Sequence, residues 1–445
     1  MVATGTELND RAVGPCNREG QFLAAGDRRY RDRPADRAQA IDDRLEAFAE
    51  AFASACPEPY EDSVGAVNPE TTKVFGRVFR EGEGRPNENI LGIEGSVARS
   101  QGASARLVLT KCPAFSVFPG QIVAVKGTSP SGTTLMATDI CASYPATAGT
   151  PQRTVPEGFA CRVVVAAGPY TAPGDLAFAP LQRLLARCKD VRPDMLLLMG
   201  PFVDSEHELV KAGTLGEDMT FADVLKARVL KPVSDFCGSA GGGETVVRIM
   251  YSPRDVTADP VLPQPRMDDE LLDAMPDGEP AHENLKTMCN PATLAVGGEG
   301  DAEGLVVAGM CGDVLRHMGA VELSRNIPGD RIARLAGHLV AQRCFYPVYP
   351  PMLDAAAADG EMDASVMVEH TAADAIMMKA LPHVLVLPSV LPPFAKPVAI
   401  PGSKLDGRVL CINPGMVSKG QYASLTLSKG SGDIMTRMQC TIEKA

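Results

Sequence analysis

The chain lacks tryptophan altogether, and aromatic residues make up only 5% of its 445 positions. Hydrophobic residues still reach 45%, so leucine, valine, alanine and methionine must fill the cores of the two or three domains that this length allows. Basic residues are outnumbered, because 43 lysines and arginines face 55 acidic residues and leave a net charge of −12. Such a chain is a poor general binder of nucleic acid, since neutralising phosphates requires basic patches.

Paired cysteines and long apolar runs are missing as well. The 12 cysteines stand singly without a Cys-x-x-Cys pair, which excludes the usual zinc-knuckle spacing and is unlike a secreted disulfide framework. The first five residues carry no apolar signal-peptide core, and no apolar run reaches the roughly 18 residues of a membrane span. We expect a soluble intracellular protein with reduced thiols and no membrane contact.

The N-terminal part divides into two segments. Residues 1–34 are polar and lack an apolar period, so we expect a disordered tail. Within residues 35–71, which we interpret as a helical linker, Ile41, Leu45, Phe48 and Phe52 recur at three- and four-residue steps and predict an amphipathic helix. The pattern leaves open whether this helix packs on its own domain or binds a partner.

Residues 72–145 predict a small closed barrel. Short strands are expected at 73–79, 89–95, 105–109, 121–126 and 134–140, with turns rich in glycine, proline and serine between them. Five short strands over about 70 residues suit an OB-type barrel, a fold that often binds single-stranded nucleic acid. These strands carry few basic residues, so we favour packing or protein contact for Phe115 and Phe118.

A linker at 146–161 precedes a layered α/β domain over residues 162–445. Strands are expected at 163–167, 195–199, 246–251, 305–310, 384–387 and 409–412, with helices at 181–188, 221–233 and 332–342. The segments 422–427 and 438–442 alternate like edge strands, and the acidic stretches 258–284 and 352–370 are interpreted as surface loops.

The strand 195–199 runs directly into Gly200-Pro201-Phe202-Val203-Asp204. This turn resembles binuclear metallophosphoesterases of the calcineurin type, in which the second strand ends in Gly-Asp-x-x-Asp and the first aspartate bridges two metals. Here the bridging position is Pro201, which has no side-chain oxygen. Two metals held about 3.5–4 Å apart require oxygen or imidazole ligands, so this end of the site has lost its main ligand.

The other strand ends depart from the metallophosphoesterase pattern in the same way. Gly168-Pro169 stands where Asp-x-His is expected, and Arg254-Asp255 stands in place of a histidine segment. Asn413-Pro414-Gly415-Met416 replaces the closing Gly-His-x-His, and a guanidinium is no metal ligand. We therefore predict a non-catalytic relic cleft without catalytic, cofactor-binding or metal-binding residues. Its predicted lining residues are Gly168, Pro169, Gly200, Pro201, Asp204, Arg254, Asp255 and Asn413.

Two further interpretations concern single side chains near this cleft. Asp204 and Asp255 are expected to form hydrogen bonds or an ion pair with Arg254. His207, which follows the second strand end, is interpreted as a surface or helix-capping residue in preference to a metal ligand.

Several segments of the chain together resemble the B subunits of DNA polymerase alpha–primase, in the expected order from about residue 29 to about residue 430. The segments are 118–128, 167–171, 192–194, 200–207, 252–256, 261–265, 342–351 and 413–420. The resemblance implies an OB-type barrel packed on a calcineurin-like phosphoesterase domain that has lost its metal site. Family members usually begin with a separate helical domain and a long linker, and this chain starts near the end of that linker.

The resemblance also implies a function without catalysis or cofactors. Members of this family tether and stabilise the catalytic subunit of polymerase alpha, through the zinc-bearing C-terminal domain of that subunit, for RNA–DNA primer synthesis at the initiation of replication. The implied partners include the primase subunits, with DNA contacted mainly through the complex, and the implied location is the nucleus.

Three alternatives remain open at this point. The first is an active metallophosphoesterase or nuclease with an unrecognised ligand set. The second is membership of the corresponding accessory subunits of polymerase delta or epsilon, since the Gly-Pro-Phe turn also fits those families. The third is a stand-alone binder of single strands, which the acidic charge disfavours.

Overall fold

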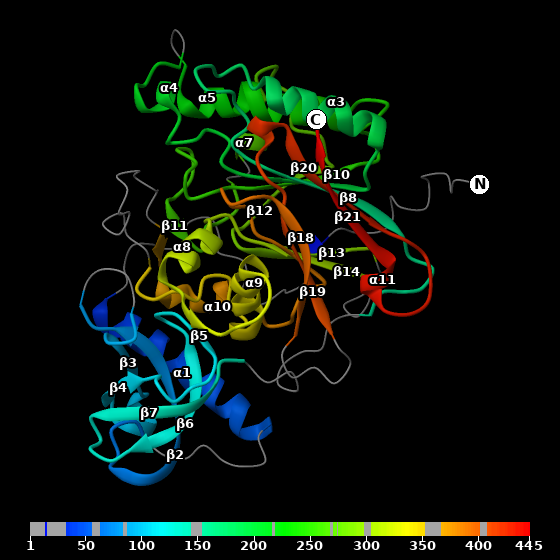
Figure 1. Cartoon of the computed structure of the whole chain (residues 1–445). Helices are drawn as coiled ribbons and strands as arrows, with labels where there is room; N and C mark the ends of the chain where they lie inside the picture. Colours follow the sequence, from blue (N-terminus) through cyan, green and yellow to red (C-terminus); the bar gives the residue numbers. More distant parts are fainter. Residues whose placement is uncertain are drawn as a thin grey trace.

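The computed structural model contains a barrel at one end and a larger α/β body at the other (Figure 1). It describes residues 14–15, 33–55, 63–82, 87–143, 154–215, 219–267, 270–273, 275–297, 304–351, 366–400 and 407–445. Most of the tail predicted as disordered lies outside these residues, as does the first half of the predicted linker 146–161. Among the helices of the described residues, none combines the length and apolar character needed to cross a membrane.

The barrel is closed by five strands in the order β2-β3-β4-β7-β6. Their bounds are β2 Asn68–Arg80, β3 Leu91–Glu94, β4 Ser104–Val108, β6 Ile122–Ser129 and β7 Thr134–Cys141. Buried and exposed positions alternate along β4 and β7, as expected of strands with one face in a core. All five predicted strands are confirmed, and β2 begins four residues earlier than the predicted barrel. The short helix α2 (Val97–Ser100) lies between β3 and β4.

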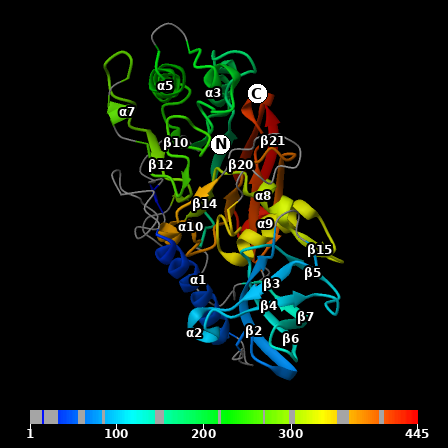
Figure 2. The ribbon, with the colours of Figure 1, turned by 90° about the vertical axis from the view of Figure 1, so that its left-hand side faces the viewer.

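Helix α1 (Pro34–Ala55) packs on the barrel of its own chain. Proline suits the first position of a helix, where its missing N–H costs no hydrogen bond. Leu45, Phe48 and Ala49 form one apolar cluster with Phe75 of β2 and with residues of β6. Figure 2 shows the helix alongside the barrel. The apolar face that the sequence predicts for this helix therefore packs against the barrel of the same chain.

The α/β body contains two six-stranded sheets. One has the order β1-β13-β14-β17-β19-β18 and the other the order β12-β10-β9-β8-β20-β21. The strands of the first sheet are β1 Gly14–Pro15, β13 Ala292–Val296, β14 Leu305–Gly309, β17 Val384–Val386, β19 Arg408–Asn413 and β18 Phe394–Ala399. Those of the second are β12 Leu285–Met288, β10 Val246–Met250, β9 Met195–Met199, β8 Cys161–Ala167, β20 Gln421–Leu427 and β21 Met438–Lys444.

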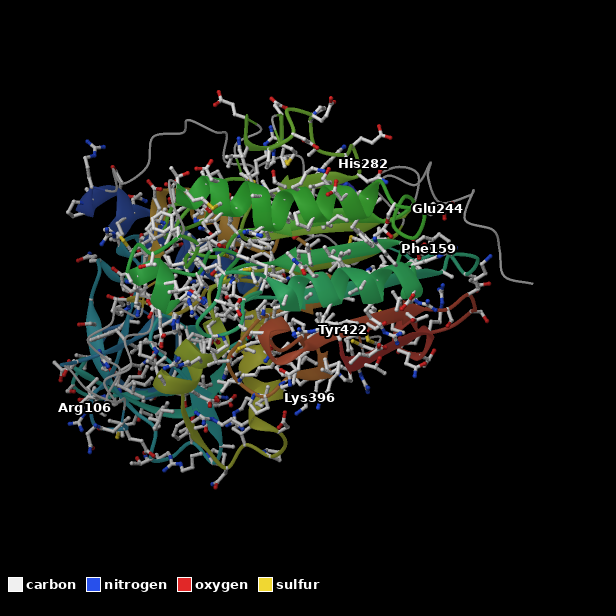
Figure 3. All side chains as sticks on the ribbon, turned by 90° about the horizontal axis from the view of Figure 1, so that it is seen from above. Arg106, Phe159, Glu244, His282, Lys396 and Tyr422 are labelled. Carbon is white, nitrogen blue, oxygen red and sulfur yellow. The ribbon has the colours of Figure 1, made fainter. Side chains whose placement is uncertain are left out.

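The two sheets pack face to face, with helices on both outer faces. Val163 and Val165 of β8 belong to the core between the sheets, whereas Val164 and Ala166 face the helices. Strands buried on both faces read as continuous apolar runs, which explains the uninterrupted sequence of β9. The view from above shows helices running alongside the strands, with the labelled Tyr422 of β20 next to one of them (Figure 3).

One outer face carries α3 (Ala179–Val191), α5 (Phe221–Leu225), a π-helical turn (Lys226–Leu230) and α6 (Lys231–Cys237). The opposite face carries α8 (Val314–Val321) and α9 (Arg331–Gln342), which Figure 1 shows between the sheets and the barrel. Shorter elements are α4 Glu208–Lys211, β11 Val261–Leu262, α7 Glu270–Asp273, β16 Met367–Val368, α10 Ala373–Ile376 and α11 Ile434–Arg437.

The structure corrects two of the sequence expectations for this body. Strand β20 was expected at an edge, but it lies between β8 and β21, so that of these two strands β21 forms the edge. The stretch 258–284, interpreted as a surface loop, contains the buried strand β11. It pairs in parallel with β16, which lies in the described end of 352–370, the other stretch interpreted as a surface loop. Its apolar pair is too short to stand out against the acidic residues around it.

The barrel and the α/β body share a sheet and a set of side-chain bonds. Strand β5 (Phe115–Val117) leaves the barrel and pairs antiparallel with β15 (Leu323–Arg325) of the α/β body. Gln342, at the end of α9, accepts a hydrogen bond from the Ile122 N–H (2.9 Å) and donates to the carbonyls of Ile122 (2.9 Å) and Ala142 (2.6 Å). The two bodies are thus joined through backbone groups as well as side chains.

A buried carboxylate lies at the same junction. The Glu322 side chain is 1% exposed, accepts a hydrogen bond from Ser116 Oγ of the barrel (2.7 Å) and pairs with Arg334 Nε (2.7 Å). Burial alone would raise the pKa of Glu322, but hydrogen bonds from His338, Arg334 and Ser116 outweigh it and lower that pKa. Phe118 is fully buried here and stacks edge-on against His338, so it serves packing between the two bodies.

Candidate functional site

The carboxyl ends of β8, β9, β10, β14, β17 and β19 meet around a cavity of about 250 Å³. Clefts at this edge of a sheet are the usual ligand sites of α/β folds. The lining residues are Gly168, Pro169, Gly200, Pro201, Ser252, Pro253, Arg254, Cys311, Gly312, Asp313, His317, Val366, Pro388, Ser389, Val390, Gly415 and Met416. Five of the eight predicted cleft residues line this cavity, and the other three lie directly behind its wall.

Gly168 and Gly200 allow two strand ends to pack without space for a side chain. The Gly168 N–H donates to the Met199 carbonyl (2.9 Å), and the Gly200 N–H donates to the Met250 carbonyl (2.8 Å). A Cβ on Gly168 would collide with the backbone of Pro201, and one on Gly200 would collide with the Asp255 carboxylate. These glycines therefore fix how closely the loops approach one another.

Asp255 links the loops that follow β9 and β10 through hydrogen bonds to their backbone. One carboxylate oxygen accepts from the N–H groups of Phe202 (2.5 Å) and Val203 (2.9 Å), and the other accepts from the Ser252 N–H (2.9 Å). The residue is 2% exposed, and burial raises its pKa to about 7 although the three donors favour ionisation. Asp255 thus ties the second strand end to the third, and it makes no bond with Arg254.

Asp204 and Arg254 form the ion pair of the cleft wall. Arg254 Nε donates to Asp204 Oδ1 (3.1 Å) and Nη2 donates to Oδ2 (2.6 Å), the two-point geometry that suits guanidinium and carboxylate. Asp204 Oδ1 also accepts from the Glu206 N–H (3.0 Å). The guanidinium therefore neutralises a carboxylate that is 5% exposed, beside the cavity at the strand ends.

Asn413, the last residue of β19, fixes the loops at the end of that strand. Its Oδ1 accepts from the N–H groups of Ser389 (3.2 Å) and Gly415 (3.1 Å), and its Nδ2 donates to the Leu391 carbonyl (2.9 Å). Asn290 plays a similar part, because its side chain bonds to both backbone groups of Cys311 and to Gln264. Asn290 was missed from sequence, since nothing in its spacing distinguishes it from a solvent-exposed turn asparagine.

The histidines near the cleft serve local structure. His207 caps α4, with its Nδ1 accepting from the Leu209 N–H (3.3 Å), which bears out the capping interpretation. His317 of α8 lines the cavity and its Nδ1 lies 3.0 Å from the Tyr346 hydroxyl. Asp313, also missed from sequence, caps α8 and accepts from the N–H of Val390 (3.0 Å).

The cleft thus offers apolar walls, prolines and one charged pair. Within the described residues, no group of three or more histidine, cysteine, aspartate or glutamate side chains gathers closely enough to hold a metal ion. The carboxylates near the cleft already bond to N–H groups or to a guanidinium. Such an arrangement can seat apolar groups and one anionic group, whereas two-metal hydrolysis would need free oxygen and imidazole donors.

Family models match both parts of the chain. The model that describes the B subunit of DNA polymerase alpha/epsilon matches residues 163–396, and the model that describes the OB domain of the B subunit of DNA polymerase alpha matches residues 38–143. The first match alone covers more than half of the chain.

Relatives that carry the name of the DNA polymerase alpha B subunit extend this similarity. The bovine protein (Bos taurus) is 32% identical over 289 residues, which are 64% of this chain and 45% of the relative. The mouse protein (Mus musculus) is 30% identical over 350 residues, 78% of this chain and 52% of the relative. The Schizosaccharomyces pombe protein is 28% identical over 420 residues, 88% of this chain and 66% of the relative. The chain spans about half the length of the mammalian relatives that it matches.

Proposed function

Because the chain belongs to the family of B subunits of DNA polymerase alpha/epsilon, we propose that it is a non-catalytic accessory subunit of DNA polymerase alpha–primase. In this role it tethers and stabilises the catalytic subunit during RNA–DNA primer synthesis at the initiation of DNA replication. The observation that carries the proposal is the pair of family matches, one on the barrel and one on the α/β body.

The barrel favours polymerase alpha over delta or epsilon. Its match is to the OB domain of the alpha family in particular, and seven relatives that share the α/β body carry the alpha name. The alternative as a stand-alone single-strand binder has little support, because Phe75, Phe115 and Phe118 are buried and unavailable for stacking on bases, and Phe79 is half-buried.

The α/β body is proposed to be a calcineurin-like phosphoesterase scaffold that has lost its metal site. Two facing sheets with helices outside, and a cleft at the strand ends, support this interpretation. Two features support the loss of the metal site. Pro201 has no side-chain atom that could bind a metal, and the carboxylate of Asp204 is neutralised by Arg254. The proposed domains are the barrel, 72–145, and the degenerate phosphoesterase, 162–445.

The proposed partners are the catalytic subunit, held through its zinc-bearing C-terminal domain, and the primase subunits of the same complex. DNA is contacted mainly through these partners, in keeping with a net charge of −12. The proposed location is the nucleus.

Co-purification tests the proposal. This chain and the catalytic subunit of polymerase alpha from the same organism are co-expressed, and the tagged chain is purified by affinity and size exclusion. We expect a stable equimolar complex that survives high salt, as an interface with a large apolar core does. Separate elution of the two chains, with each one folded, would refute the role.

A further inference from the structure

The cleft contains apolar surface that the described part of the chain leaves accessible. Val390 is 43% exposed at the rim, and it is one of four large apolar side chains that the described residues leave exposed to this degree. Val366 and Met416 line the cavity beside it, together with Pro169, Pro201, Pro253 and Pro388. Proline side chains form rigid apolar walls, and methionine side chains form adaptable ones. A cavity of about 250 Å³ accommodates one or two large apolar side chains.

One cationic donor faces this apolar surface. Arg254 donates hydrogen bonds to Asp204 from Nε and Nη2, and its Nη1 makes no hydrogen bond with the described residues. The side chain is 27% exposed, so Nη1 can meet a ligand without breaking the existing pair. Asp313 is the acidic residue of the lining, and its oxygens already accept from the N–H groups of Arg316 and Val390. Nη1 of Arg254 is therefore the cationic donor that the described lining offers to an acceptor of a ligand.

We propose that the cleft is a docking pocket for an extended segment of a protein partner, in which one or two apolar side chains enter beside Val390, Val366 and Met416 and a neighbouring carboxylate binds Nη1 of Arg254. The inference rests on the proposed function, because a cleft freed from catalysis is available for assembly. It adds to that function by naming the surface and the chemistry of the segment that it binds.

A phosphate ligand fits the same surface less well. Phosphate recognition uses several converging cationic or N–H donors, whereas here one guanidinium is already shared with a carboxylate. The four prolines of the wall have no N–H to donate, and Val366, Val390 and Met416 add apolar side chains beside them. A protein segment with apolar and acidic residues uses both features of the cleft.

The test uses the full chain and a phage-displayed library of random 12-residue peptides. Selection on the wild-type chain is followed by binding measurements on Val390→Glu, which places a charge at the apolar rim. The matched control is Val67→Glu, because Val67 is an exposed valine (69%) on the barrel. We expect selected peptides to contain an apolar pair next to an acid, to bind Val390→Glu at least about tenfold more weakly and to bind Val67→Glu unchanged, since burying an unpaired charge is unfavourable.

A second measurement isolates the contact with Arg254 without altering the fold. Replacing the peptide acid by its amide should weaken binding about fivefold, in line with the loss of a charge-assisted hydrogen bond. Selected peptides that bind Val390→Glu as well as wild type, or the absence of selected peptides, would overturn the inference. If inorganic phosphate or a single-stranded oligonucleotide displaces the peptide at a concentration below that of the peptide, the cleft is a site for a phosphate ligand instead. Co-purification of the wild-type chain with the polymerase catalytic subunit tests the proposed function separately from these outcomes.

Discussion

Arg254 and Asp204 are joined at two points, with Nε–Oδ1 at 3.1 Å and Nη2–Oδ2 at 2.6 Å. The pair stands beside the cavity, where the loops after β9 and β10 meet, and it is a structural contact between those two loops.

Removal of the guanidinium should destabilise the fold. Arg254→Ala leaves the Asp204 carboxylate, which is 5% exposed, without its counter-charge, and we expect a loss of about 3 kcal/mol in the free energy of unfolding. The double variant Arg254→Ala/Asp204→Ala should recover part of this loss. Chemical denaturation measures both values.

An exposed ion pair provides the control for this cycle. Lys211 and Glu206 pair with side chains that are 47% and 31% exposed, so Lys211→Ala should cost less than about 1 kcal/mol. Equal losses for the two single variants would contradict the structural role of Arg254.

Asp255 should give the stability a pH dependence of unusual sign. Its pKa is about 7 in the folded chain against an ordinary value of 3.8, so between these values the folded chain holds a proton that the unfolded chain has released. The free energy of unfolding therefore falls as pH rises through this window, by up to about 1.4 kcal/mol per pH unit from this group.

Asp255→Asn has no proton to release and lacks this dependence. The asparagine side chain also places an N–H against a backbone N–H that needs an acceptor. The substitution should therefore lower the free energy of unfolding by about 2 kcal/mol at pH 7. The difference in unfolding free energy between wild type and variant should be larger at pH 5 than at pH 8. A difference that is constant with pH, or larger at pH 8, would show that Asp255 is ionised throughout.

Glu322 should act in the opposite direction. Its pKa lies below the ordinary value of 4.5, so its stabilising effect is present above that pH and is lost as the solution is acidified further. Glu322→Gln should lower stability at pH 7 and reduce the loss of stability on acidification to pH 3. Thermal unfolding at both pH values checks this, and an unchanged acid sensitivity in the variant would count against it.

Gln342 should hold the barrel on the α/β body. Gln342→Ala leaves three backbone groups of the barrel without partners in a buried place, and we expect a loss of about 3 kcal/mol. Gln439→Ala, at an exposed position of β21, is the control and should change stability by less than about 0.5 kcal/mol. If both variants unfold at the same denaturant concentration, the junction does not depend on this side chain.

The sequence predicted well what local pattern determines. Apolar runs ending at Gly168, Gly200 and Asn413 located three strand ends, and parallel strands bring such ends to one edge of a sheet. The resemblance of these strand ends to a metallophosphoesterase cleft was sufficient to anticipate the ion pair of Asp204 with Arg254. The bond also expected between Asp255 and Arg254 was wrong, because Asp255 binds backbone N–H groups.

Contacts between distant segments could not be predicted in this way. Ser116 and Glu322 are 206 positions apart, and nothing near either residue identifies the other. Strand β20 alternates like an edge strand, yet β21 pairs on its outer side, and only the tertiary fold shows this. Asn290 and Asp313 stabilise loops through backbone bonds, which leave no periodic pattern in the sequence.

The most direct test of the central claim is to measure bound metal and hydrolysis together. The purified full chain is equilibrated with Mn²⁺, and bound metal and cleavage of a generic phosphodiester are determined on the same sample. We expect no stoichiometric Mn²⁺ and no hydrolysis above the uncatalysed rate, because within the described residues no group of three or more histidine, cysteine, aspartate or glutamate side chains is placed to hold a metal ion. About two Mn²⁺ per chain, with turnover that disappears in Asp204→Asn, would contradict it.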